Sequence, residues 1–418
     1  MNTHSNMIER ITQGLRSPFV LLFILALILR LIGVWLIASD VGSDALGSYL
    51  VDTKNYVEAA EAIRTDFNFQ TMGVTIFGPG YPVFLALVGL LLLPHPLALS
   101  IIQALFGALA VVLMIHFALT LTNDRKISIL SGLMLAIMPR AINLSSRLYS
   151  ETPFVFLLLA GLILYVNGIK SQKPKYFMFS AIIITAAAFV RPVGQYMFLV
   201  LIISAIIYAI PHKAKSFMSV MRQMKWPVMV SLILIILTGL WVIRNNSLYG
   251  FRYLGFSGPT GLLKISALIR ADIEGTTYEQ AIEKSVAELK VSGNYDKEYY
   301  RTYADYADSL FKRLLRGNPW ISFAVIIKNI YRNTHIVWGW PYTLLTFLGL
   351  LVMLSHRAYR PAVVVLILYL YFAFFAGFTV CQGKRIFFPG QIMAIIPISY
   401  LVLEVFYKCQ KLYFKIRR

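Results

Sequence analysis

The sequence predicts an all-α polytopic membrane protein with about ten transmembrane helices. Its mean hydropathy is +0.69, and hydrophobic residues make up 58% of the chain against 14% charged residues. Apolar runs recur from residue 18 almost to the C-terminus, and several reach the roughly 20 residues that a spanning helix needs. Because lipid offers the backbone no hydrogen-bonding partner, these runs are expected to be helices.

Ten apolar runs are candidate spans, at roughly 18–38, 97–121, 127–145, 150–168, 176–190, 194–210, 226–244, 334–355, 361–379 and 386–406. A further run at 82–93 is short and bounded by GPGYP and PHP, which favours a re-entrant or interfacial segment. Counting that run as a span would place the basic loops 123–126, 170–175 and 212–215 outside. Leaving it out places them inside with both chain ends, as the positive-inside rule expects. We therefore expect one integral membrane domain over residues 1–418.

The charge of the chain follows the same topology. The net charge is +20, and lysine and arginine gather in short loops and in the C-terminal KCQKLYFKIRR. Nothing else favours nucleic acid as a partner. The first apolar run is longer than the core of a signal peptide and carries Arg30, so we expect it to be retained. Cys381 and Cys409 flank the last span on opposite sides, which argues against a disulfide.

Two polar loops are expected on the outer face. The first outer loop, residues 39–81, holds Asp40, Asp44, Asp52 and Glu58 close to the membrane, either as solvated acids or because a site there needs a carboxylate. The large outer loop, residues 244–333, contains two amphipathic helices, TYEQAIEKSVAELKV and YYRTYADYADSLFKRLLRG. This loop would serve either as a lid or for packing alone.

Cations at the ends of spans form the candidate site on the same side. They are Arg140, Arg147, Arg191, Arg244, Lys384 and Arg385, with Glu151 among them. Any one of these cations is explained by snorkelling to the membrane interface. Six cations on the side of the membrane that should be poor in positive charge indicate a function. Since arginine grips phosphate oxygens with its planar fork, an acid facing these arginines predicts chemistry on a membrane-borne phosphate. The carboxylate would act as general base.

Other catalytic classes lack their signatures. The sequence contains no HExxH, no GxSxG, no Walker A motif and no dinucleotide-binding fingerprint. Its histidines lack metal-ligand spacing, so no cofactor is predicted with certainty, and a divalent metal held by loop carboxylates is an open alternative. Without a nucleotide-binding domain, an activated sugar would have to arrive on a lipid.

Short motifs follow one another in a recognisable order. Arg30 in the first span precedes Asp52 and Tyr56, then AAEAI and GPGYP at 78–82. Later come MPRAINLSSRLYSETPF at 138–154, FVRPVG at 189–194, WVIRNNSLYGF at 241–251 and KRIFFPGQIMAIIP at 384–397. This set resembles the membrane-embedded GT-C glycosyltransferases that use polyprenyl-phosphate sugars, among them protein O-mannosyltransferases and lipid A aminoarabinose transferases. The resemblance also implies seven spans before the large outer loop, as the charge bias does.

The resemblance implies roles for individual residues. Asp52 would deprotonate the acceptor hydroxyl with Tyr56 close by, and Asp44 is the alternative base because some relatives have their acid nearer the first span. Glu151 would bind or orient the sugar. The residues implied as phosphate or sugar contacts are Arg147, Arg191, Arg244 and Arg385.

One segment departs from the family pattern. Phe77 and Gly78 stand where some relatives carry Glu-Lys before a proline. The phosphate or metal contact assigned there would be absent or come from elsewhere, with Lys384 as the candidate.

The expected function is transfer of a monosaccharide, with inversion, from a polyprenyl-phosphate donor to a lipid-linked or glycan acceptor. It would take place on the outer, periplasmic face of the inner (cytoplasmic) membrane. The alternatives are a transporter or flippase of an anionic lipid-linked substrate, and a polysaccharide polymerase or ligase. The two halves do not look alike, unlike the inverted repeats of many transporters, and a polymerase would be expected to carry its decisive residues in a late large loop.

Overall fold

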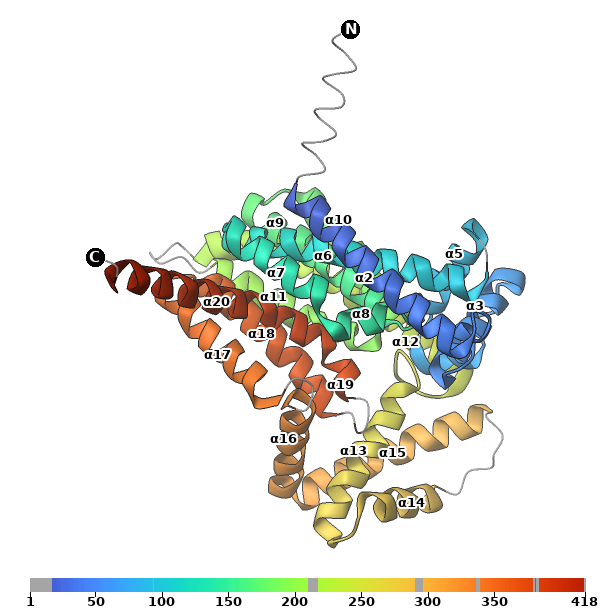
Figure 1. Ribbon diagram of the computed structural model, residues 1–418. Helices are drawn as coiled ribbons and strands as arrows, with labels where there is room; N and C mark the ends of the chain where they lie inside the picture. The colour runs from blue at the N-terminus through green and yellow to red at the C-terminus, as the bar shows by residue number, and fades with distance from the viewer. Residues whose placement is uncertain are drawn as a thin grey trace.

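The protein is described by a computed structural model that covers residues 17–92, 94–209, 217–289, 296–335, 339–378, 380 and 383–416. Every regular element in these ranges is a helix, as Figure 1 shows. Most helices form one bundle, and α13, α14 and α15 lie together at one end of it. The predicted all-α membrane class is therefore confirmed.

Seven helices in the described ranges are long and apolar enough to cross a membrane. They are α2 (Pro18–Val41), α6 (Pro96–Thr122), α9 (Glu151–Ser171), η2 with α11 (Pro192–Tyr196 and Met197–Ala209), α12 (Phe217–Tyr249), α18 (Tyr359–Gly377) and α20 (Phe388–Ile416). An eighth is gained if α7 (Arg125–Ile137) and α8 (Pro139–Ser145), bent by 59°, are one span. The predicted number of ten is approximate because α10 (Pro174–Val190) and α17 (Gly339–Ser355) have 17 residues each.

The bend between α7 and α8 explains the charged residue within α2. A helix that stops leaves carbonyls of its last turn without partners, and Pro139 has no N–H to offer them. Arg30 is 1% exposed and donates to the carbonyls of Leu135 at 3.4 Å and Ala136 at 3.3 Å. It also donates to the carbonyl of Ala26 in its own helix at 3.0 Å. Arg30 thus satisfies polar groups that apolar surroundings would leave costly, which is a structural role.

The first outer loop folds into short helices against the bundle. These are η1 (Ala45–Gly47), α3 (Val51–Asp66), α4 (Met72–Phe77) and α5 (Gly80–Leu91). The ring of Tyr56 in α3 packs on Phe77 and Tyr81, with centroids 4.7 and 4.6 Å apart. A Cβ at Gly80 would collide with the backbone at the end of α10, so glycine lets α5 begin in close contact with that helix. With 12 residues, α5 is too short to span, in line with the short run expected at 82–93.

The large outer loop forms four helices. They are α13 (Ser257–Glu274), α14 (Tyr278–Glu288), α15 (Lys297–Gly317) and α16 (Pro319–His335). Arg270 ties α13 to α14 through an ion pair with Glu288 at 2.5 Å, and it also pairs with Glu274 of its own helix at 2.9 Å. The N–H of Phe256 donates to the carbonyl of Thr75 at 2.8 Å, which joins this layer to the first outer loop. The two polar loops of the sequence therefore meet in space.

Candidate active site

Four charged side chains from distant parts of the chain meet where the two outer loops join. Arg385 Nη1 lies 2.7 Å from Asp52 Oδ2, and Arg385 Nε lies 2.7 Å from Glu151 Oε1. Arg191 Nη1 lies 2.6 Å from the same Glu151 oxygen. Glu151 is fully buried, while Asp52, Arg191 and Arg385 keep side-chain exposures of 20%, 13% and 22%. Glu151 therefore fixes two arginines that still face accessible space.

Each of these residues stands at the end of a helix. Asp52 is in the first turn of α3 and Glu151 in the first turn of α9, where a helix dipole favours negative charge. Arg191 ends α10 in an extended conformation because Pro192 follows it. Arg385 belongs to the short α19 (Gly383–Ile386), which precedes α20. The cluster thus lies at one boundary of the apolar bundle.

Aromatic rings enclose the charged cluster. The guanidinium of Arg385 lies over the ring of Tyr149 at 3.9 Å, and the Tyr56 hydroxyl is 3.4 Å from Ser150 Oγ. Burial, together with the negative charge of Glu151, raises the pKa of Tyr56 above its ordinary value, so its hydroxyl is a neutral hydrogen-bonding group. Burial alone would lower the pKa of Arg385, but the charge of Glu151 and hydrogen bonds to both acids raise it. Arg385 is a permanent cation.

A cavity of about 360 Å³ opens on this cluster. Asp52, Tyr56, Arg191 and Arg385 contribute to its wall, and the outer layer closes it from the other side. The residues supplied by α13 and α15 are Ser257, Thr260, Gly261, Lys264 and Tyr303. Lys264 has no hydrogen bond or ion pair with any residue that the structure describes, so its ammonium is available to a ligand.

An apolar groove of about 750 Å³ adjoins the charged cavity. It runs between α11 and α18, which line it with Leu199, Ile203, Leu370, Phe374 and Phe375 among others. Cavity and groove share the wall residues Pro192, Val193, Ser257, Gly261 and Ile386. A molecule with a charged head and a long apolar tail would find matching surroundings for both parts.

The remaining predicted residues lie away from this cavity. Asp44 is 92% exposed and lies 3.0 Å from His95 Nε2, and Asp40 is exposed at the end of α2. Arg147 donates to the Tyr49 hydroxyl at 3.1 Å. Arg244 donates to the carbonyl of Phe69 at 2.8 Å and lies over the ring of Trp241 at 4.3 Å.

Two further predicted cations and a cysteine need separate mention. Arg140 in α8 is half-buried and feels the charges of Glu151 and Arg385, but it is not part of the cavity wall. The side chain of Lys384 and all of Cys381 lie outside the described residues, and Cys409 is a free, exposed cysteine.

The structure adds residues that the sequence reasoning missed. Thr260 and Lys264 are four positions apart in α13 and so lie on one helical face. That spacing within SGPTGLLK at 257–264 was the available signal, but it did not indicate what this face of the helix contacts. As for a metal, no group of three His, Cys, Asp or Glu side chains comes together within the described ranges. The carboxylates of Asp52 and Glu151 form ion pairs with arginine side chains.

Comparison with known proteins supports the predicted resemblance. Residues 96–249, which include Glu151 and Arg191, match the model of the dolichyl-phosphate-mannose-protein mannosyltransferase family. No curated protein sequence matches the chain.

Solved structures show the same fold at low identity. The oligosaccharyltransferase AglB from Archaeoglobus fulgidus, in complex with an inhibitory peptide and a dolichol-phosphate, matches with a TM-score of 0.57 and 12% identity, over 96% of this chain and 51% of that one. A structure of the Archaeoglobus fulgidus oligosaccharyltransferase tethered to an acceptor peptide matches with a TM-score of 0.55 and 14% identity, over 95% and 50%. The chain thus spans about half the length of these structures.

ArnT from Cupriavidus metallidurans, bound to undecaprenyl phosphate, matches over 92% of this chain and 78% of that one, at 12% identity and a TM-score of 0.42, a likeness too distant to support an inference. The family whose model matches residues 96–249 and the archaeal structures of the same fold are glycosyltransferases, which is the enzyme class that the sequence predicts. These findings confirm the predicted resemblance, and the chain is a membrane protein of the GT-C glycosyltransferase fold.

Proposed function

We propose that the protein transfers a monosaccharide from a polyprenyl-phosphate donor to a hydroxyl of a lipid-linked or glycan acceptor. The observation that carries this proposal is the junction of a charged cavity with an apolar groove, since the two share five wall residues. A polyprenyl-phosphate sugar has this division into an anionic head and an apolar tail. The archaeal oligosaccharyltransferase of the same fold was solved with a dolichol-phosphate.

The cations of the cavity suit the phosphate of such a donor. Asp52 and Glu151 balance Arg191 and Arg385, so the four groups together carry no net charge. Lys264 adds one positive charge without a partner of its own in the described chain. The phosphate would therefore bind between the two arginines and Lys264, through charge-assisted hydrogen bonds.

Asp52 is the proposed general base. Its carboxylate takes the proton of the acceptor hydroxyl while the hydroxyl oxygen bonds to the anomeric carbon of the sugar. The bond between that carbon and the phosphate oxygen breaks, and polyprenyl phosphate leaves with the electron pair. Attack from the side opposite the phosphate inverts the anomeric configuration. Arg385 stabilises the leaving phosphate, since it lines the cavity beside the carboxylate of Asp52.

The reaction is proposed to occur on the periplasmic face of the inner membrane. The cavity lies at the end of the bundle where the two outer loops meet, while the basic loops 123–126 and 170–175 connect helices at the opposite ends of their spans. The positive-inside rule assigns those basic loops to the cytoplasm.

The test is a transfer assay on the full chain in lipid, supplied with a panel of polyprenyl-phosphate sugars and acceptors. It scores released polyprenyl phosphate for the wild type, Asp52→Asn and a matched control, Glu58→Gln. Glu58 is on the same helix, but its side chain is 62% exposed and outside the cavity. We expect release by the wild type and the control, and a loss of at least about 100-fold in Asp52→Asn.

Two outcomes would contradict the proposal. If Asp52→Asn released as much polyprenyl phosphate as the wild type, Asp52 would not be the base and Asp44 would be the next candidate. Absence of release with every donor and acceptor, together with movement of intact donor lipid across liposomes, would replace glycosyl transfer by transport.

A further inference from the structure

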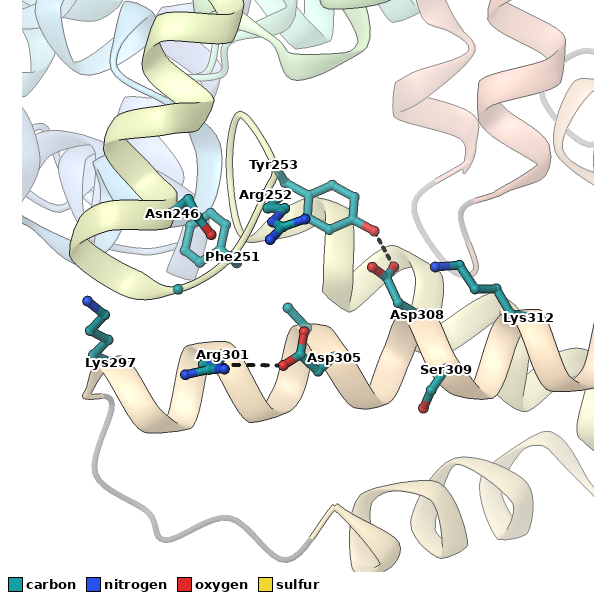
Figure 2. Close-up of a pocket in the computed structure, with 12 residues that line it drawn as sticks. Asn246, Phe251, Arg252, Tyr253, Lys297, Arg301, Asp305, Asp308, Ser309 and Lys312 are labelled. Atoms are coloured by element: carbon teal, nitrogen blue, oxygen red, sulfur yellow. Dashed lines mark hydrogen bonds and ion pairs between the residues drawn. The ribbon is translucent and has the colours of Figure 1, made fainter.

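A second polar cavity, of about 600 Å³, lies between α15 and the segment 250–253 that precedes α13 (Figure 2). Its size falls within the usual range of ligand pockets. Nine of its twelve lining residues are polar or charged, in contrast to the apolar groove beside it. The cavity is separate from the charged cavity at Asp52, with which it shares no lining residue.

One face of α15 forms the floor of this cavity. Lys297, Arg301, Asp305, Asp308 and Lys312 follow one another at intervals of three or four residues and all line it. In Figure 2 the side chains of Lys297, Asp308 and Lys312 point from the helix toward the segment that carries Arg252 and Tyr253, while Arg301 and Asp305 face each other along the helix. Five of the eight charged residues of α15 therefore lie on the face that looks into the cavity.

The walls of the cavity are held in place. Phe251 and Ala304 are 1% and 4% exposed and pack in one aromatic cluster with Phe256 and Tyr300. The Tyr253 hydroxyl donates to Asp308, which ties the segment 250–253 to α15 (Figure 2). Tyr253 lines the apolar groove as well as this cavity, so it lies between the two.

Some of the charged side chains around the cavity have hydrogen-bond or ion-pair partners, and others do not. Lys297 donates to the carbonyl of Ser247 at 2.6 Å, and Arg301 lies 3.7 Å from Asp305. Arg252 and Lys312 have no hydrogen bond or ion pair with any described residue. The lining carries four cations against two carboxylates, so the cavity as a whole is positive and its two unpaired cations flank the hydrogen-bonded Asp308.

We propose that this cavity binds an acidic saccharide. Arg252 and Lys312 would hold its carboxylate or phosphate group through charge-assisted hydrogen bonds. Asp305 and Asp308 would accept hydrogen bonds from sugar hydroxyls, for which a purely cationic surface has no acceptors. The identification of this saccharide as the distal part of the acceptor rests on the proposed function. The binding of an acidic saccharide to this cavity does not depend on it.

The test measures binding to the full chain in lipid nanodiscs by isothermal titration calorimetry, without any donor. The probes are a trisaccharide that ends in glucuronic acid, the neutral trisaccharide that ends in glucose, and one that carries a phosphate in place of the carboxylate. The double variant Arg252→Gln with Lys312→Gln removes both unpaired cations. The matched control is Arg316→Gln, an exposed cation in the last turn of α15 that does not line the cavity.

We expect the wild type to bind an acidic probe at least about tenfold tighter than the neutral one. The double variant should lose this difference, and the control should keep it within about twofold. Preference for the phosphate or for the carboxylate probe assigns the anionic group. The proposal is overturned if acidic and neutral probes bind equally to the wild type, or if the control loses as much affinity as the double variant.

The result is independent of the transfer assay. Since no donor is present, inactivity of the protein in glycosyl transfer leaves the binding difference unchanged. Conversely, if the protein is active in glycosyl transfer but binds acidic and neutral probes equally, only the proposed saccharide site is refuted. Because both substituted side chains are exposed, the folded state is retained, and equal unfolding temperatures of variant and control verify this.

Discussion

Replacing Glu151 by Gln isolates the role of the buried carboxylate between two arginines. Contacts of 2.6 and 2.7 Å put the charge centres about 4 Å apart, and at an effective dielectric constant of about 20 each pair is worth about 4 kcal/mol. Desolvation offsets much of the gross value of about 8 kcal/mol. We therefore expect a net loss of about 3–5 kcal/mol, the usual penalty when one partner of a buried pair is removed.

The same substitution should separate binding from turnover. Neutralising Glu151 changes the net charge of the four-residue cluster from zero to +1. Polyprenyl phosphate should then bind more tightly and inhibit as a product, while turnover falls roughly 100-fold because the two arginines lose their fixed positions.

Thermal unfolding followed by tryptophan fluorescence measures the stability, and the transfer assay with added polyprenyl phosphate measures the inhibition. Glu58→Gln is the control, since Glu58 pairs only loosely with Lys54, at 3.8 Å on the surface. A Glu151→Gln protein with the unfolding temperature and turnover of the wild type would refute the argument from burial and pairing.

Three further changes test other parts of the molecule. Arg385→Lys should lower turnover roughly 10–100-fold, because a single ammonium cannot replace the three nitrogen contacts to Asp52 and Glu151; undiminished turnover would contradict this. Lys264→Gln should raise KM for the donor about tenfold with a smaller change in kcat, because it removes a phosphate contact and not the base; an effect on kcat alone would contradict this assignment. Hydrogen bonds from Arg270 hold the pKa of Glu288 at about 2, below its ordinary 4.5, so its stabilisation of the outer layer is present above pH 4.5 and lost as the pH falls toward 2. Protease cleavage of residues 257–317 should rise over that window, and Glu288→Gln should be cleaved readily at neutral pH as well; a flat profile in the wild type would count against the ion pair.

Hydropathy predicted the helices better than it predicted their ends. The runs around α10 and α17 are apolar enough to suggest spans, yet each of these helices has 17 residues within the described ranges. The run 127–145 contains Pro139, where the structure bends by 59°. Composition reports whether a segment prefers lipid, whereas length and direction depend on the neighbouring helices.

The candidate site was predicted in part. The fold brings together four of the predicted residues, Asp52, Glu151, Arg191 and Arg385. Asp52 and Arg385 are 333 positions apart, so their contact was suggested by the order of the motifs and could not be predicted from residue spacing alone. Arg147 and Arg244 share the same boundary but turn to other partners. The part of the cavity wall that α13 supplies could not be predicted from the sequence. A helical pattern shows which residues share a face, but it does not show which other elements that face contacts.

The partners of Arg30 are synthesised at different times during translation. Its partner Ala136 lies 106 residues later in the sequence, and at 5–20 residues per second this distance takes roughly 5–20 s to synthesise. Of the three carbonyls that Arg30 contacts in the folded protein, only that of Ala26 belongs to its own helix. Until the segment around Ala136 has been synthesised, α2 therefore lacks two of the carbonyl partners that Arg30 has in the folded protein.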